Sequence, residues 1–253
     1  MDDQGKISDT KDFAARDDAK ADALKSLASK RAENMYKSMH KLNENDIAVM
    51  KSVAESGALN IEREVGGLYD PKRSFKPCDN LPNKPQEYLR TAGLYKCGLS
   101  EVVLGDVDGL VIWWSSELIS KAFENSLIMW HTHPNQQDPG MIHSPPSIAD
   151  FRVAVNACRD LLVNVDQLIV TKLGLWRLHV QFGDIMKASE EEVENGINNF
   201  NFYANFIQSK ENVAKTNAFV DPPHRRDQLT AEDFVAMIGG NVHWFTVEYY
   251  AYV

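Results

Sequence analysis

Cysteine is scarce in this chain of 253 residues, and the three that occur, Cys78, Cys97 and Cys158, form no Cys-x-x-Cys pair. Their odd number and wide separation argue against a disulfide framework or a structural zinc site built on cysteine. A reducing compartment fits this cysteine usage, so we expect a cytoplasmic protein. Any metal must then be held by histidine and carboxylate side chains.

Long apolar runs and an excess of positive charge are also lacking. No run approaches the roughly 20 apolar residues that span a bilayer, and the N-terminus is polar and charged, so we expect neither a membrane span nor a secretory signal. The formal net charge is -9, whereas binding to a phosphate backbone requires basic residues. Membranes and nucleic acids are therefore not expected as partners.

The composition is that of a folded protein, with 43% hydrophobic and 25% charged residues. Apolar residues recur at helical spacing in some segments and at strand spacing in others, which predicts an α+β fold with a central mixed sheet flanked by helices. Helices are expected at 20–42, at Ile47 to Gly57 after a break at Asn43 to Asp46, at Ser115 to Phe123, Ile148 to Leu162, 188–210 and Thr230 to Ile238. Strands are expected at Ile61 to Tyr69, Glu101 to Leu104, Leu110 to Trp114, Ser126 to Trp130, Leu168 to Thr171, Leu175 to Phe182 and His243 to Val253.

These elements divide the chain into three parts. Residues 1–45 form a charged N-terminal helical extension, 46–184 a core, and 185–253 a C-terminal extension of helix and strand. The amphipathic stretch 20–42 either packs on the core or docks an assembly partner. Residues 70–99 carry four prolines and little periodicity, which predicts a long loop.

The residues most suited to metal binding or catalysis are His131-Thr-His133-Pro134 and Ser147-Ile-Ala-Asp150. In an extended backbone, residues two apart project on the same side about 6 to 7 Å apart at Cα, so both imidazoles can meet one metal. Ser147 and Asp150 share one face at the start of a helix. Two histidines and one carboxylate, with the fourth position left to water, are typical of catalytic zinc.

Each motif taken alone has a plainer interpretation. Ser147 and Asp150 have the spacing of a helix N-cap, and an isolated His-x-His is more often a polar strand end than a metal site. The joint occurrence of the two motifs, between an apolar strand and a strongly periodic helix, favours the metal.

The two motifs resemble the signature of the JAMM metalloprotease family, also called the MPN-plus or JAB domain, over roughly residues 46–184. The resemblance implies that His131, His133 and Asp150 bind Zn2+ and that Ser147 stabilises an oxyanion. The family has a catalytic glutamate at the start of an upstream strand, and Glu64 in Glu64-Val-Gly-Gly-Leu68 matches it. Glu62, which would face the same side of the strand, is the alternative base.

The chain departs from the family between His133 and Ser147, where its connection is longer. Asp138-Pro-Gly140 and Ser144-Pro-Pro146 predict an ordered flap across this stretch. His143, within the flap, is either an exposed loop residue or a fourth metal ligand.

The resemblance implies a zinc metallopeptidase that cuts a peptide or isopeptide bond beside the tail of a ubiquitin-like or other protein substrate, as a deubiquitinase does. Substrate selection is expected at residues 70–99. One alternative is a structural component of a phage or multiprotein assembly built on the same fold. Hydrolysis of a small molecule or of a nucleic-acid-linked adduct is a further alternative, which the acidic charge disfavours. Zinc stoichiometry separates an enzyme from a scaffold.

Overall fold

The computed structural model describes residues 41–60, 63–72, 90, 92–105, 127–134, 145–161, 163–202, 235 and 242–252. All of them belong to one compact unit, His40–Val253, and a second unit, Met1–Met39, lies outside the described residues. Several expected elements also lie outside the described residues. They are nearly all of the helix at 20–42, the strand at Leu110 to Trp114, the helix at Ser115 to Phe123 and, except for residue 235, the helix at Thr230 to Ile238. No helix in the described ranges is long and apolar enough to cross a bilayer.

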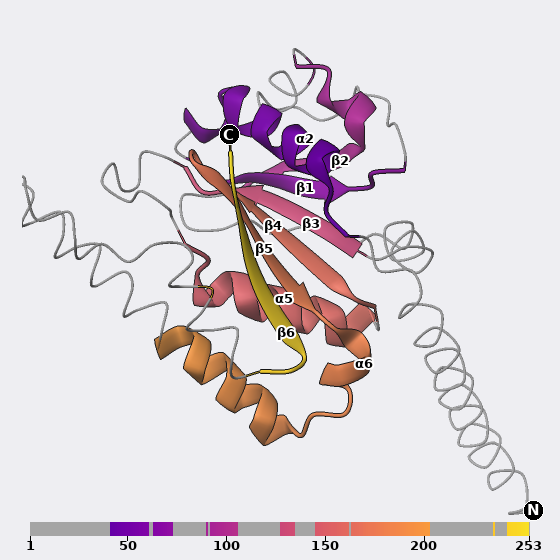
Figure 1. Ribbon diagram of the computed structural model, residues 1–253, viewed down its shortest axis with the longest axis vertical. Coiled ribbons are helices and arrows are strands. Elements are labelled where there is room, and N and C mark those ends of the chain that lie inside the picture. The colour runs from indigo at the N-terminus through magenta and orange to yellow at the C-terminus, as the bar shows by residue number, and fades with distance from the viewer. Residues whose placement is uncertain are drawn as a thin grey trace, which may run out of the picture. The chain divides into compact units, whose positions relative to one another are not determined.

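The predicted α+β class is confirmed by one mixed sheet with helices packed on it (Figure 1). The sheet has six strands in the order β2-β1-β3-β4-β5-β6. Only β3 and β4 run parallel, and the other neighbours are antiparallel. The strands are β1 (Val65–Tyr69), β2 (Leu99–Leu104), β3 (Leu127–Thr132), β4 (Val165–Val170), β5 (Gly174–Val180) and β6 (Phe245–Ala251).

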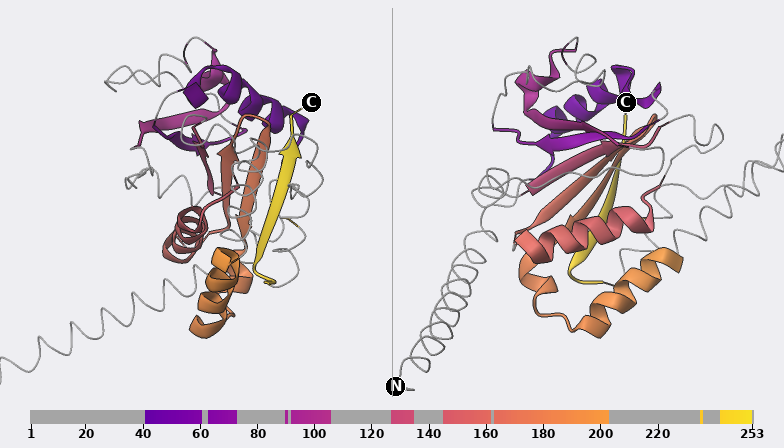
Figure 2. Two further views of the ribbon diagram at one scale, coloured as in Figure 1. Left: turned by 90° about the vertical axis from the view of Figure 1, so that its left-hand side faces the viewer. Right: turned by 180° about the vertical axis from the view of Figure 1, so that it is seen from behind.

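The parallel pairing of β3 with β4 determines where the two sequence motifs meet. Parallel neighbours cannot be joined by a tight turn and need a crossover, here containing α5 (Ile148–Leu161). The right-hand view of Figure 2 shows α5 lying across the strands of the sheet. In such a crossover the helix begins beside the end of the first strand. The sequence motifs that end β3 and begin α5 are therefore neighbours.

Helix α2 (Glu44–Glu55) covers one face of the sheet and begins at Glu44, three residues before the expected start at Ile47 and within the stretch where the sequence predicts a break. The Asn43 side chain accepts hydrogen bonds from the amides of Asn45 and Asp46, and Asp46 Oδ2 accepts one from the Asn43 amide at 2.9 Å. The buried Tyr69 hydroxyl donates to Asp46 Oδ1. Burial and the Asp46 carboxylate both raise the pKa of Tyr69, so it remains a donor.

Helix α5 packs on the opposite face with the period that its sequence predicts. Its buried residues are Asp150, Phe151, Ala154, Val155, Ala157, Cys158 and Leu161. Phe151 stacks on Phe200 of the helical segment 190–202, with ring centroids 4.6 Å apart, and contacts Phe245 of β6 edge-on at 4.3 Å. Aromatic contacts thus attach the C-terminal elements to α5.

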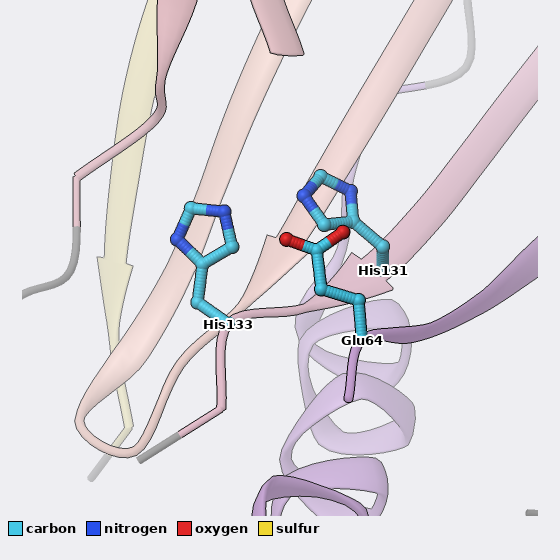
Figure 3. Close-up of side chains that lie close together, drawn as sticks. All are labelled: Glu64, His131 and His133. Carbon is cyan, nitrogen blue, oxygen red and sulfur yellow. The ribbon is translucent and has the colours of Figure 1, made fainter. Parts of the chain in front are cut away.

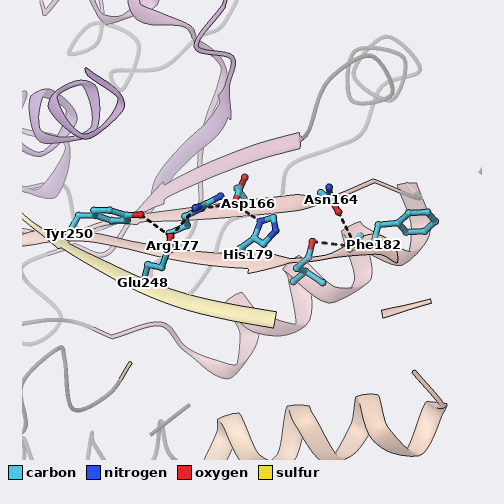
Figure 4. Close-up of polar contacts among 9 residues, drawn as sticks. Asn164, Asp166, Arg177, His179, Phe182, Glu248 and Tyr250 are labelled. Atoms are coloured by element: carbon cyan, nitrogen blue, oxygen red, sulfur yellow. Dashed lines mark hydrogen bonds and ion pairs between the residues drawn. The ribbon is translucent and has the colours of Figure 1, made fainter. Parts of the chain in front are cut away.

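The strand expected at Leu175 to Phe182 is present as β5, antiparallel to β4 and β6, but the half-buried face that its alternation of polar and apolar residues predicts is absent from it. All seven residues of β5 are buried, Arg177 and His179 among them, and Phe182 begins the short helix α6 (Phe182–Ile185) instead. The polar members are tolerated inside because Asp166 Oδ1 lies 2.7 Å from Arg177 Nε and 2.8 Å from His179 Nδ1 (Figure 4). Arg177 also donates to Glu248 of β6 at 2.9 Å.

The Asp166 carboxyl is kept ionised by the side chains of His179 and Arg177. Burial alone would raise the pKa of this carboxyl, but His179 and Arg177 outweigh burial and keep the pKa below its ordinary value. Burial and the Glu248 carboxylate raise the pKa of Tyr250, which donates to Glu248, to about 12. This network is an ion-pair cluster inside the fold, on the sheet face opposite α5.

Replacing Asp166 with alanine should lower the free energy of unfolding by about 3 to 5 kcal/mol, because the Arg177 charge would lose its buried carboxylate. Urea denaturation at neutral pH measures this cost. The control is Arg159→Ala, which removes an ion pair between Arg159 and the exposed Glu190 and should cost at most about 1 kcal/mol. Equal costs for the two variants would contradict the assignment.

The loss of unfolding free energy in Asp166→Ala should also depend on pH. Because the folded-state pKa of Asp166 lies below its unfolded value of about 3.9, its ionised form stabilises the fold above that value. The difference between wild type and Asp166→Ala should therefore be full at neutral pH. It should shrink as the pH falls through the folded-state pKa.

Candidate metal centre

The two histidines predicted as metal ligands lie at one end of the sheet, at the C-terminal end of β3. His131 lies in β3 itself, and the His133 amide donates to the Val170 carbonyl at 3.0 Å, which continues the pairing of β3 with β4. Because His131 and His133 are two residues apart in extended backbone, both rings lie on the same side. Their centroids are 5.1 Å apart, with the ring planes tilted by 56°.

Glu64 reaches the same place from the neighbouring strand. Gly66 pairs with His131 in antiparallel register, so Glu64, two residues earlier, lies beside His133. The Val65 amide also donates to Thr132 Oγ1 at 3.0 Å, which fastens the start of β1 to the end of β3. Figure 3 shows the Glu64 carboxyl group directed between the two imidazoles. One ligand atom from each of Glu64, His131 and His133 lies within 4.8 Å of the others.

Asp150 approaches from the first turn of α5. Its Oδ1 lies 3.0 Å from His131 Nε2 and its Oδ2 lies 3.5 Å from His133 Nε2. The same carboxylate accepts a hydrogen bond from the Ser147 amide at 2.6 Å, while Ser147 Oγ accepts one from the Asp150 amide at 3.2 Å. The helix-cap interpretation of Ser-x-x-Asp is thus correct, and the same geometry places Asp150 against the histidines.

The charge on Asp150 is strongly favoured. Burial by itself would raise its pKa, but His131 and His133 outweigh burial and hold the pKa of this carboxyl well below its ordinary value of 3.8. Asp150 is therefore an anion at neutral pH, facing two imidazole nitrogens. An anionic carboxylate held against two imidazole nitrogens is an arrangement suited to a cation.

His131 Nε2 supplies the test of whether a metal fits. This buried atom has no aligned hydrogen-bond partner in the described part of the chain, although Asp150 Oδ1 is only 3.0 Å away. When two side chains bind the same ion, their ligand atoms lie close together without the alignment of a hydrogen bond. The His131 nitrogen and the Asp150 oxygen have this arrangement. The donors are two imidazoles and two carboxylates with no sulfur, a set that suits zinc or a similar divalent ion.

The structure thus brings together Glu64, His131, His133, Asp150 and, through Asp150, Ser147. It does not separate the roles of the two carboxylates, since Glu64 shares a ligand cluster with the histidines and Asp150 touches both rings. Glu62, His143 and most of the expected flap, residues 135–144, lie outside the described residues.

Sequence reasoning missed Gln167, a buried residue of β4 whose Nε2 lies 3.4 Å from His131 Nδ1. The only signal in the sequence is a polar residue immediately before the apolar stretch Leu168 to Thr171. Its neighbour could not be named because the register of β4 on β3 is not encoded in any local pattern.

Comparison of the chain with models of protein families, with characterised proteins and with solved structures finds no match in any of the three.

Proposed function

We propose that this chain is a zinc-dependent metallopeptidase that hydrolyses a peptide or isopeptide bond in a protein substrate. The observation that carries the proposal is the convergence of His131 and His133 with two carboxylates, Glu64 and Asp150, at one end of β3. The resemblance of the two motifs to the JAMM signature adds the reaction class, and it rests on the sequence alone.

His131, His133 and Asp150 would hold the metal. Zinc would supply a Lewis acid that polarises the scissile carbonyl and lowers the pKa of bound water to about 7. The chain's part is to fix the ligands before the substrate arrives. The β3 backbone sets the two imidazoles, and the Ser147 cap sets the Asp150 carboxylate.

Glu64 is proposed as the general base and acid. It is half-buried, and its carboxyl group faces the space between the imidazoles, within reach of a proton released there (Figure 3). Asp150 is unsuited to this role, because its surroundings favour the anion too strongly for it to carry a proton. Two carboxylates in different environments can therefore divide ligation from proton transfer.

Ser147 is proposed to stabilise the oxyanion. Its hydroxyl oxygen accepts from the Asp150 amide at 3.2 Å, which uses a lone pair and leaves the hydroxyl hydrogen for donation. The side chain is exposed, so a substrate carbonyl can approach it. A ubiquitin-like tail is the substrate that the family resemblance favours, and its extended backbone could be gripped as an added strand.

Purified protein should carry one zinc ion per chain, and His131→Ala and Asp150→Ala should each lose zinc and activity together, since each removes one of three protein ligands. Elemental analysis after zinc reconstitution and dialysis measures the stoichiometry. His243→Ala is the control, because His243 is exposed and precedes β6, outside the site. If the wild type retains no zinc, the chain is a scaffold on this fold, and the enzymatic proposal is wrong.

Glu64→Gln should keep its zinc while turnover falls by about 10² to 10⁴-fold, because an amide cannot accept the proton. Activity on ubiquitin-like fusions and the zinc content should be measured on the same samples. Asp150→Asn is the matched comparison, and it should lose zinc as well as activity. The reverse pattern, with zinc lost in Glu64→Gln and kept in Asp150→Asn, would exchange the roles of the two carboxylates. Full activity in Glu64→Gln with none in Glu62→Gln would move the base to Glu62.

Ser147→Ala should retain zinc and lose about 10² to 10³-fold in rate, the usual cost of one oxyanion donor. The substitution also removes a helix cap, which costs about 1 kcal/mol of stability. Ser189→Ala is the matched control, since Ser189 and Glu192 form the same reciprocal cap. Both variants should be destabilised alike, and only Ser147→Ala should be slow. Equal rates in the two variants would remove Ser147 from the mechanism.

A further inference from the structure

Gln167 lies behind His131, on the side of the ring away from Asp150. It belongs to β4, is 4% exposed, and approaches His131 Nδ1 with its amide nitrogen at 3.4 Å. Its amide oxygen is buried and has no hydrogen-bond partner among the described residues. His131 therefore has Asp150 near one ring nitrogen and an uncharged amide near the other.

The direction of this contact depends on which ring nitrogen of His131 carries the proton. With the amide nitrogen of Gln167 facing Nδ1, the pair forms a hydrogen bond only if Nδ1 offers a lone pair and Nε2 bears the hydrogen. Metal binding through Nε2 requires the opposite tautomer, with the hydrogen on Nδ1. In that tautomer two donors would face each other across the contact.

Rotation of the terminal amide removes the conflict. Exchanging the positions of the amide nitrogen and oxygen presents Oε1, the atom that now lacks a partner, to the Nδ1 hydrogen. Histidines that bind metals generally donate their second ring hydrogen to such an acceptor, which fixes the tautomer and the ring orientation.

We propose that Gln167 is a positioning residue for the metal site, an inference that rests on the proposed metal-binding function. With its amide oxygen turned toward the ring, Gln167 accepts the Nδ1 hydrogen and so fixes His131 in the tautomer whose Nε2 can bind the cation. Glutamine can serve both tautomers, whereas a carboxylate could only accept. A third buried carboxylate beside Glu64 and Asp150 would also add negative charge to the cluster.

The first test is the affinity for zinc, measured by competition with a chelator and independent of activity. Gln167→Met keeps the volume and removes the acceptor, and it should weaken zinc binding by about 10 to 100-fold. Gln167→Glu restores an acceptor and should bind zinc much more tightly than Gln167→Met. Asn164→Leu is the matched control. It removes a buried amide at the far end of β4, where Asn164 accepts from the Phe182 amide, and should leave zinc affinity unchanged.

The second test uses the wild type and so does not depend on whether a variant folds. Nitrogen-15 NMR of histidine-labelled protein should show the His131 hydrogen on Nδ1 when zinc is bound. If zinc binds to the wild type but Gln167→Met binds it equally well, or if the hydrogen is on Nε2 with zinc bound, the inference is wrong and the proposed function stands. If the wild type binds no zinc, both are wrong.

Discussion

The position of β3 between β1 and β4 is the constraint on which the site depends. Antiparallel pairing with β1 brings Glu64 beside His133, and parallel pairing with β4 brings Gln167 behind His131. The parallel pairing also requires the crossover that returns the chain at Asp150. A shift of one residue in either register would turn the alternating side chains to the other face and disperse the cluster.

Two buried carboxylates, Asp166 and Asp150, lie on opposite faces of the sheet and differ in the charge of the side chains that surround them. Asp166 has a permanently charged partner within the chain, Arg177, 2.7 Å away (Figure 4). Asp150 accepts a hydrogen bond from the Ser147 amide and contacts two imidazoles, and in the described part of the chain no lysine or arginine forms an ion pair with it. A divalent cation would supply the missing charge. This difference is the physical reason for assigning a metal to the Asp150 cluster and a structural role to the Asp166 network.

Much of this arrangement could be predicted from the sequence, because its signals are local. The periodicity of α5 and the apolar strand leading to His131 have a short repeat or a fixed spacing, and each lies where the sequence predicts. The pairing of Ser147 with Asp150 is also local, three residues apart.

The errors and omissions concern contacts between distant segments. Alternation from Leu175 onward predicts an exposed polar face, but the partner that allows Arg177 to be buried, Asp166, lies 11 residues away on another strand. Gln167 and His131 are 36 residues apart and meet only through the β3–β4 register. The candidate ligands His131, His133 and Asp150 can be proposed from the sequence because they come in two short motifs, whereas the supporting residue Gln167 belongs to neither motif.

The most direct measurement of the central claim is X-ray absorption spectroscopy at the zinc edge of reconstituted wild-type protein. Scattering from two imidazole nitrogens at about 2.0 to 2.1 Å, with the remaining ligands oxygen, is the result that His131, His133 and a carboxylate would give. Sulfur scattering at about 2.3 Å, or the absence of imidazole from the bound ion, would contradict the site described here.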